Sequence, residues 1–233
     1  MVLKVDNIHA YYGVSHILHG VTIQIKRGEI VGLIGNNGVG KTTLLKSIMG
    51  LTRVRSGHIN FQDQDLLHLP PFKISRLGIS LIPENRDIFP DLTVYENLLL
   101  GMTNSRRKRK VIGDKIHDYF PILKARLNQK GGTLSGGEQQ MLAIARGLVG
   151  EPELILVDEF SEGLQPLVIR NIVGILREVQ KEGKTILMVE QDARLALHLS
   201  ERIYIMEKGE ISYHGLPEEL LSNAKILKDH LAI

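Results

Sequence analysis

One eight-residue segment constrains this chain more than any other: Gly-Asn-Asn-Gly-Val-Gly-Lys-Thr at residues 35–42. It follows a short apolar segment, Glu29–Ile34, and precedes a helical pattern over Thr42–Met49. The glycines let the backbone fold around an anion, and the start of the helix adds the positive end of its dipole. The segment therefore predicts a phosphate-binding loop between a strand and a helix, with a chance glycine-rich turn as the alternative.

The residue types in this loop give roles to single positions. Lys41 would bridge the β- and γ-phosphates of a nucleotide, and the Thr42 hydroxyl would be a ligand of Mg²⁺. ATP and Mg²⁺ are therefore the expected cofactors. The residues expected to bind the nucleotide in this segment and directly after it are Gly35, Asn36, Asn37, Gly38, Gly40, Lys41, Thr42 and Thr43.

Two carboxylates complement the loop. The apolar segment Leu154–Val157 is expected to be a buried strand, and Asp158 and Glu159 follow it directly. Ligands of α/β sheets bind at the carboxyl ends of the strands. We expect Asp158 to hold Mg²⁺ through its water shell and Glu159 to polarise the attacking water as general base. Solvated loop acids are the alternative, but together with the loop the pair indicates a P-loop NTPase.

The order of apolar segments predicts the fold class α/β. Short apolar strands alternate with helical patterns, which implies a mostly parallel sheet covered on both faces. The first residues alternate as antiparallel strands, and a helical stretch interrupts the α/β pattern. We expect a single domain over 1–233, with an antiparallel β part at about 1–30, a P-loop NTPase core at about 30–89 and 151–215, an inserted helical subdomain at about 90–150, and a tail at about 216–233.

Composition excludes several classes of protein. The chain has no cysteine, so disulfides and thiolate metal sites are excluded. A net charge of +3 is too small to argue for a nucleic-acid partner. The first residues lack the apolar run of a signal peptide, and all apolar runs are far shorter than the roughly 20 residues that cross a bilayer. Any membrane role would therefore depend on a partner.

Residues 134–140, Leu-Ser-Gly-Gly-Glu-Gln-Gln, carry a family resemblance. Ser135 and Glu138 form a capping-box pattern, and Gly136 and Gly137 leave the helix start bare as a second anion site. This site has no obvious ligand within a molecule that already has a phosphate-binding loop. The segment resembles the LSGGQ signature of ABC ATPases, and its spacing from Asp158 is typical of that family.

The resemblance implies roles for further residues. Ser135 and the two glycines after it would contact the γ-phosphate of ATP bound to a second ABC ATPase subunit. Tyr12, with Tyr11 as the alternative, would stack on adenine. Glu84 stands where most relatives have a glutamine that contacts Mg²⁺, and it could serve the same ion. Gln191 replaces a histidine that contacts the γ-phosphate, so we expect a catalytic contact from its side chain.

Within the family, the chain looks most like the ATP-binding subunits of branched-chain amino acid importers, with urea and short-chain amide importers close behind. The resemblance implies transmembrane permeases and, indirectly, an extracytoplasmic solute-binding protein. It places the chain as a peripheral subunit on the cytoplasmic face of the membrane, without nucleic acid. Its partner ATPase would be non-identical, although a homodimer is possible in vitro. The passages that carry this resemblance are Pro83–Arg86, Phe89–Pro90, Leu92–Leu98, Leu134–Arg146 and Val189–Gln191.

Some features leave alternatives open. Phe160 stands where a proline usually follows the acidic pair, and Gln165 stands where an aspartate usually ends the next loop. Gln165 and Gln191 leave open an alternative function, a nucleotide-binding regulator that hydrolyses little ATP. A non-transport ABC ATPase is a further alternative. The basic run Arg106–Lys110 is expected to be a solvated connector or a contact for anionic lipid headgroups.

Overall fold

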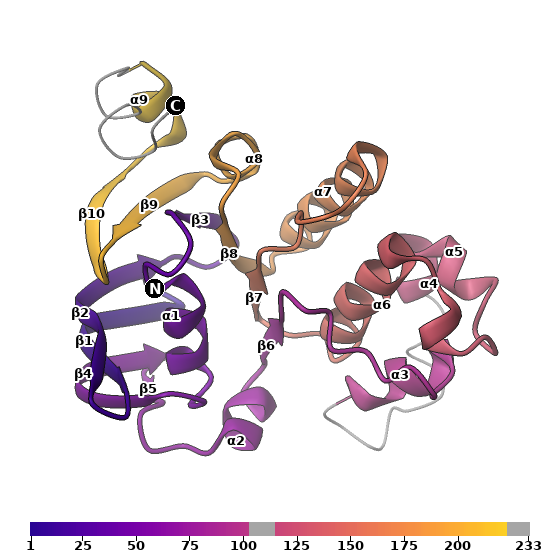
Figure 1. The fold of residues 1–233 in the computed structure, drawn as a ribbon, viewed down its shortest axis with the longest axis horizontal. Helices are drawn as coiled ribbons and strands as arrows, with labels where there is room; N and C mark the ends of the chain where they lie inside the picture. The colour runs from indigo at the N-terminus through magenta and orange to yellow at the C-terminus, as the bar shows by residue number, and fades with distance from the viewer. Residues whose placement is uncertain (103–114, 223–233) are drawn as a thin grey trace.

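The computed structural model describes residues 1–102 and 115–222 of the chain. The basic run Arg106–Lys110 and the residues after Ser222 lie outside the described residues, so the expectations for them stay predictions. The described part forms two β-sheets with helices arranged around them (Figure 1).

The described strands and helices follow the order that the sequence pattern predicts. Strands come first, a helical stretch lies in the middle, and β/α alternation returns after it. The strands are β1 (Leu3–Tyr12), β2 (Ser15–Ile25), β3 (Ile30–Ile34), β4 (Arg53–Phe61), β5 (Gln64–Asp65), β6 (Ile79–Ile82), β7 (Leu154–Asp158), β8 (Thr185–Glu190), β9 (Arg202–Glu207) and β10 (Glu210–Gly215). The helices are α1 (Lys41–Ile48), α2 (Pro71–Arg76), α3 (Val94–Leu100), α4 (Lys115–Tyr119), α5 (Pro121–Lys124), a short 3-10 helix (Gly131–Thr133), α6 (Gly136–Leu148), α7 (Pro166–Lys181), α8 (Ala193–Leu199) and α9 (Pro217–Ser222).

The larger sheet confirms the predicted α/β core. Its strand order is β10-β9-β3-β8-β7-β6, and the five strands from β9 to β6 pair in parallel. Only β10 is antiparallel, because it forms a hairpin with β9. This order brings the carboxyl ends of β3 and β7 to the same edge, one strand apart. The phosphate-binding loop and the Asp158–Glu159 pair therefore meet there.

The antiparallel part is larger than expected. The second sheet has the order β2-β1-β4-β5, so it also takes in Arg53–Phe61 and Gln64–Asp65. The expected division at residue 30 had left these residues in the α/β core. Local alternation of apolar residues identifies a strand but carries no information about its distant partner. Pairs such as Leu3 with Phe61 are therefore visible only in the folded chain.

The central sheet is buried on both faces. In β8, Ile186 and Met188 point into one hydrophobic cluster with α3, α6, α7 and α8, whereas Leu187 and Val189 point into the other. The second cluster joins this face to α1 and to the antiparallel sheet. A strand buried on both faces has to be apolar at every position, which explains the continuous apolar runs of β3, β7 and β8.

Two helices of the helical stretch begin at capping residues, and one of these, Ser135, is the residue that the sequence predicts. Thr93 and Ser135 are the N-caps of α3 and α6, and both make complete capping boxes with Glu96 and Glu138. Each cap satisfies amide groups that a helix start leaves without an intrahelical partner. The caps fix where α6 begins, and the signature residues are its first turn.

The described helices show no membrane span: each is too short or too polar to cross a bilayer.

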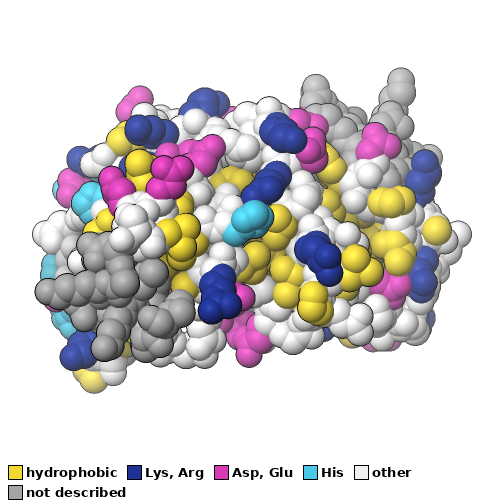
Figure 2. Space-filling model, turned by 90° about the horizontal axis from the view of Figure 1, so that it is seen from above, with side chains coloured by type: hydrophobic (Ala, Val, Ile, Leu, Met, Phe, Trp, Pro, Cys, Tyr) yellow, Lys and Arg dark blue, Asp and Glu magenta, His cyan; other side chains and the backbone are white. Residues whose placement is uncertain are grey.

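Figure 2 views the molecule from above, from the side of α7 and α8. On this face, hydrophobic side chains lie between acidic and basic ones, so no single charge dominates it.

Candidate functional site

The loop between β3 and α1 has the backbone that the motif predicts. Gly38 and Gly40 have φ angles of 79° and 114°, a region that side chains with a Cβ rarely adopt. Gly40 is also the N-cap of α1, so the loop runs directly into a helix start. A loop of this shape aims backbone N–H groups and the helix dipole at the same space.

Lys41 is held inside this loop. Its Nζ donates to the carbonyl oxygens of Gly35 and Asn36 at 2.8 and 3.0 Å, and it lies 2.9 Å from Glu159 Oε1. The two charged side chains are only 3% and 10% exposed. These contacts hold the lysine within the loop that the sequence predicts to bind phosphate. The lysine also neutralises a carboxylate that burial would otherwise leave without a partner.

Thr42 and Asp158 meet across the edge of the sheet. The Thr42 hydroxyl donates to Asp158 Oδ1 at 3.2 Å. Burial raises the pKa of Asp158 to about 6, and the nearby charges of Glu159 and Glu84 act in the same direction. The Thr42 hydrogen bond and Lys41 oppose this rise. The pair therefore offers hard oxygen donors in a region with excess negative charge, which suits a divalent cation such as Mg²⁺.

An acidic cluster extends this region. Carboxylate oxygens of Glu84, Glu159 and Glu162 all lie within 4.8 Å of one another. Glu159 has a φ angle of 40°, unusual for a residue with a side chain, and its N–H donates to Val189 O at 2.9 Å. The fold thus holds the predicted general base in a strained backbone conformation, which is a feature that concentrates at functional sites.

A pocket brings most of the predicted residues together. Tyr12 lies at its rim and is 47% exposed, which leaves a ring surface for stacking. The alternative, Tyr11, is already stacked on His16 at 4.2 Å and lies under Arg55 at 3.9 Å. Sequence reasoning missed Ile17, because it looks like any other alternating strand residue. The described residues that line the pocket are Tyr12, Ile17, Asn37, Gly38, Gly40, Lys41, Thr42, Thr43, Glu84 and Glu159.

Other predicted positions lie outside this lining. Gly35, Asn36 and Asp158 are not among the residues that line the pocket; Asn36 is exposed, whereas Gly35 and Asp158 are buried. Gln191 is exposed in the bend between β8 and α8. Phe160, one of the unexpected residues, is 1% exposed and packs into a hydrophobic cluster, so an apolar side chain anchors the loop after Glu159. Gln165 is the N-cap of α7 and makes no side-chain capping bond.

Sequence reasoning also missed Glu190, at the end of β8. It is 1% exposed, and its carboxylate accepts hydrogen bonds from the Ser161 hydroxyl at 2.8 Å and the Ser161 N–H at 3.3 Å. Burial raises the pKa of Glu190 to about 7. An acidic residue in an otherwise apolar strand was the available signal, because such a residue needs a partner inside the protein.

The signature residues form a separate site at the start of α6. Among the described residues, the lining of the P-loop pocket does not include Ser135, Gly136 or Gly137. Figure 1 shows α1 beside the antiparallel sheet and α6 in the helical part of the chain. The two glycines permit close packing, because a Cβ on Gly136 would lie 3.1 Å from the Arg86 guanidinium and one on Gly137 would lie 3.0 Å from Val168. The two helix starts that the sequence predicts to bind anions, at α1 and α6, are therefore separate in the described structure.

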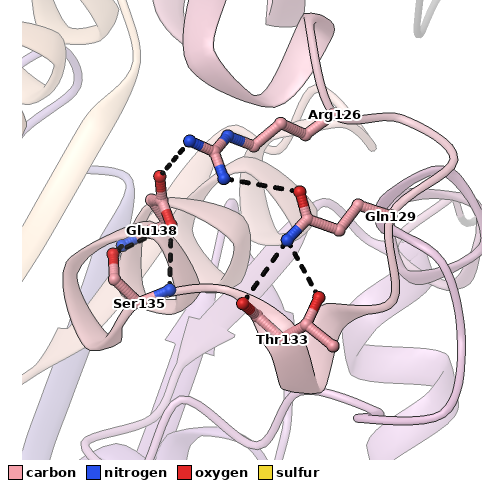
Figure 3. A network of polar contacts seen from close by, with 5 residues as sticks. All are labelled: Arg126, Gln129, Thr133, Ser135 and Glu138. Carbon is pink, nitrogen blue, oxygen red and sulfur yellow. Dashed lines mark hydrogen bonds and ion pairs between the residues drawn. The ribbon is translucent and has the colours of Figure 1, made fainter.

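A network of polar contacts surrounds this helix start (Figure 3). Ser135 donates its N–H and its hydroxyl to Glu138 Oε2 at 2.8 and 2.9 Å, and Arg126 lies 3.1 Å from Glu138 Oε1. The hydrogen bond from the Ser135 N–H lowers the pKa of the Glu138 carboxyl, and Arg126 acts in the same direction. Glu138 is therefore a carboxylate at neutral pH.

Comparison with known proteins identifies the family of this chain. Residues 18–162 match the ABC transporter family. The chain is 43% identical to the high-affinity branched-chain amino acid transport ATP-binding protein BraG of Pseudomonas aeruginosa, over 99% of each chain. It is 38% identical to the probable branched-chain amino acid transport ATP-binding protein LivF of Archaeoglobus fulgidus, over 97% of each.

A solved structure agrees with the sequence relatives. The ADP conformation of MJ1267, an ATP-binding cassette of an ABC transporter, has a TM-score of 0.86 and 27% identity over 97% of each chain. The family match, the relatives and this structure all describe the same kind of protein. The chain therefore belongs to the ABC transporter family, as an ATP-binding subunit that hydrolyses ATP.

Proposed function

We propose that this chain energises the import of branched-chain amino acids. The relatives BraG and LivF, which support this substrate class, match the chain almost from end to end. ATP would bind in the pocket at the edge of the central sheet, with adenine stacked on Tyr12 and the triphosphate in the loop at 35–42. The exposed ring of Tyr12 and the position of Lys41 support this orientation.

Mg²⁺ would be held by Thr42 and Asp158, with Glu84 contributing through its carboxylate. The oxygen donors of these residues fit the ion, and the excess negative charge around Asp158 favours a cation. When bound, the ion neutralises charge that develops on the phosphates. The residues of the chain then position the nucleotide: Lys41 contacts the β- and γ-phosphates, and the N–H groups of the loop surround them.

Glu159 would act as general base for the attacking water. In the described structure its carboxylate pairs with Lys41. A γ-phosphate would compete for that lysine, so nucleotide binding would free the carboxylate to accept a proton from water. Gln191, exposed at the end of β8, would donate an N–H to the γ-phosphate. Removal of the base should therefore stop hydrolysis without removing the phosphate contacts.

The observation that carries the proposal is the separation of the two anion sites. One site lines the pocket with the P-loop, and the other, at Ser135, has no part in that lining among the described residues. ATP would complete its contacts only when Ser135, Gly136 and Gly137 of a second ABC ATPase subunit approach the γ-phosphate. Closing and reopening of this dimer would move transmembrane permeases, which receive solute from an extracytoplasmic binding protein.

We propose a peripheral position on the cytoplasmic face of the membrane. The names of BraG and LivF, both amino acid transport ATP-binding proteins, support this placement. The partner ATPase would be non-identical in the cell, with self-association possible in vitro. The charges on the face in Figure 2 are mixed, and this face gives no support for a nucleic-acid partner.

Glu159→Gln tests the enzymatic part of the proposal. Because only the base is lost, we expect ATP turnover to fall by about 10²- to 10⁴-fold while ATP still binds. Phosphate release measures turnover, and gel filtration in ATP detects a trapped dimer. A monomer at saturating ATP would point to an obligate unlike partner, and unchanged turnover would remove Glu159 from the mechanism.

Uptake of labelled leucine by the host organism tests the substrate class. Deletion of this chain should lower leucine, isoleucine and valine uptake, and the wild-type chain should restore it whereas Glu159→Gln should not. Urea uptake is the matched control, since it should be unaffected by the deletion. Normal leucine uptake with a loss of urea uptake would reverse the assignment between the two importer types.

A further inference from the structure

The signature helix places an acidic side chain where a phosphate is expected to bind. Glu138 Oε2 accepts both the hydroxyl and the N–H of Ser135, the same serine that would contact the γ-phosphate. A capping box needs only an acceptor at this position, and glutamine can take the place of glutamate. The negative charge of Glu138 strengthens the cap, because it lies at the positive end of the helix dipole, but it repels a phosphate at the same helix start.

Arg126 is placed to offset this charge. Its Nη2 lies 3.1 Å from Glu138 Oε1, the oxygen that is not used by Ser135. The two carboxylate oxygens thus have separate partners: one faces the helix start, and the other faces the arginine (Figure 3). Glu138 is the less exposed member of the pair, with 13% of its side chain accessible against 39% for Arg126.

The loop before the helix holds Arg126 in this position. Arg126 Nη1 donates to Gln129 Oε1 at 3.4 Å, and Gln129 Nε2 donates to the Thr133 hydroxyl at 2.9 Å. The contacts connect the arginine to the residues that lead into Ser135 (Figure 3). A side chain that is already held by its neighbours loses less conformational entropy when it forms an ion pair. The Arg126–Glu138 ion pair is therefore more favourable than one between two unrestrained surface side chains.

We propose that Arg126 is a positioning residue of the signature site, which neutralises Glu138 so that Ser135 and the start of α6 can take the triphosphate of ATP held by a second subunit. The inference rests on the proposed function, because it requires a phosphate to approach Ser135 from another chain. It adds a residue from outside the signature segment to that site.

Arg126→Met should impair the paired ATPase by exposing the phosphate to an uncompensated carboxylate. Because Arg126 is partly exposed and screened by solvent, we expect about a two- to fivefold loss in kcat/KM at each site. Arg126→Met/Glu138→Gln should recover that loss, since glutamine keeps the capping box without the charge. A side chain that only supported the loop would not be rescued by a change at Glu138.

Steady-state ATP hydrolysis by the full chain measures these effects. The assay is run at several protein concentrations, and at low and high salt. Lys130→Met is the matched control: it removes a positive charge from the same loop, but Lys130 pairs with Asp91 at 3.9 Å and not with Glu138. ATP affinity of the Glu159→Gln background should be the same with and without Arg126→Met at protein concentrations too low for pairing, since Arg126 does not line the P-loop pocket.

The outcomes separate this inference from the proposed function. A loss in Arg126→Met that Glu138→Gln rescues, and that high salt reduces, supports the inference. If Ser135→Ala lowers activity but Arg126→Met matches Lys130→Met, or is not rescued, the inference alone is overturned. If Ser135→Ala leaves activity unchanged, no phosphate depends on the signature site, and both the proposed function and the inference are overturned.

Discussion

Three buried acidic residues at the edge of the central sheet, Asp158, Glu159 and Glu190, have different kinds of partner. Lys41 and Glu159 compensate one another, and Thr42 donates to Asp158. Glu190 has no cation among its contacts in the described structure: it accepts two hydrogen bonds from Ser161, while Glu159 and Asp192 add negative charge. Burial and this charge together favour its neutral form.

Glu190 gives the folded chain a specific dependence on pH. Burial raises its pKa from the ordinary value of 4.5 to about 7, so the folded state binds a proton more tightly than the unfolded state does. The folded state is therefore favoured below about pH 4.5, and its free energy of unfolding decreases as the pH rises to about 7. The decrease is on the order of 3 kcal/mol, at about 1.4 kcal/mol for each unit of pKa.

Glu190→Gln tests this expectation, because an amide does not titrate in this range. Urea unfolding of the two proteins at pH 5 and pH 7.5 should show that the variant gains stability relative to the wild type as the pH rises. Ser161→Ala is the companion variant: it removes the hydroxyl donor and should steepen the pH dependence. A stability difference between Glu190→Gln and the wild type that stays constant with pH would contradict the assignment.

At the scale of elements, packing between α3 and α6 holds the signature helix against the rest of the helical part. The C-cap of α3 is Gly101, and a Cβ there would lie 2.0 Å from the carbonyl oxygen of Arg146 in α6. Arg146 in turn donates to the carbonyl oxygens of Arg86 and Asp87, which follow β6. The glycine therefore permits a close approach that connects α3, α6 and the loop after β6.

Gly101→Ala should destabilise the chain by about 1–3 kcal/mol, because its methyl group has to displace the backbone of α6. Gly174→Ala is the matched control. Gly174 is exposed within α7, with no atom within 4 Å of its Cβ position, so alanine there should stabilise the helix by about 0.5–1 kcal/mol. Thermal unfolding measures both variants, and equal effects of the two substitutions would contradict the packing argument.

At the scale of the whole molecule, one sheet connects two hydrophobic clusters. Alternate residues of β8 belong to different clusters: Leu187 faces the antiparallel sheet and α1, whereas Met188 faces the helices on the opposite side. The same alternation occurs in β3 and β7. Neither cluster can lose its packing without exposing one face of the sheet that supports the other.

Unfolding should therefore be a single transition. Leu187→Ala and Met188→Ala each remove a fully buried side chain and should lower the free energy of unfolding by about 2–5 kcal/mol. Urea denaturation followed by far-UV circular dichroism and by tyrosine fluorescence should give the same midpoint for both signals in each variant. Different midpoints, or two transitions after only one of the substitutions, would show that the clusters unfold independently.

The sequence alone determined the features that depend on local chemistry. Glycines at 38 and 40 specify the phosphate-binding loop, serine followed three residues later by glutamate specifies the start of α6, and unbroken apolar runs specify the buried strands. Each feature follows from a few neighbouring residues. The conformational freedom of glycine, the capping of a helix start and the spacing of apolar residues along an element all depend on residues that are close in the sequence.

The tertiary structure decided what depends on distant contacts. It joined β4 and β5 to the first two strands, brought Lys41 against Glu159, buried Glu190 against Ser161, and placed Arg126 on Glu138. Strand partners and ion pairs join residues that are far apart in the chain, and any acidic residue can meet many basic ones until the backbone is folded. Local pattern fixes the type of each element, whereas only packing selects which elements and charges meet.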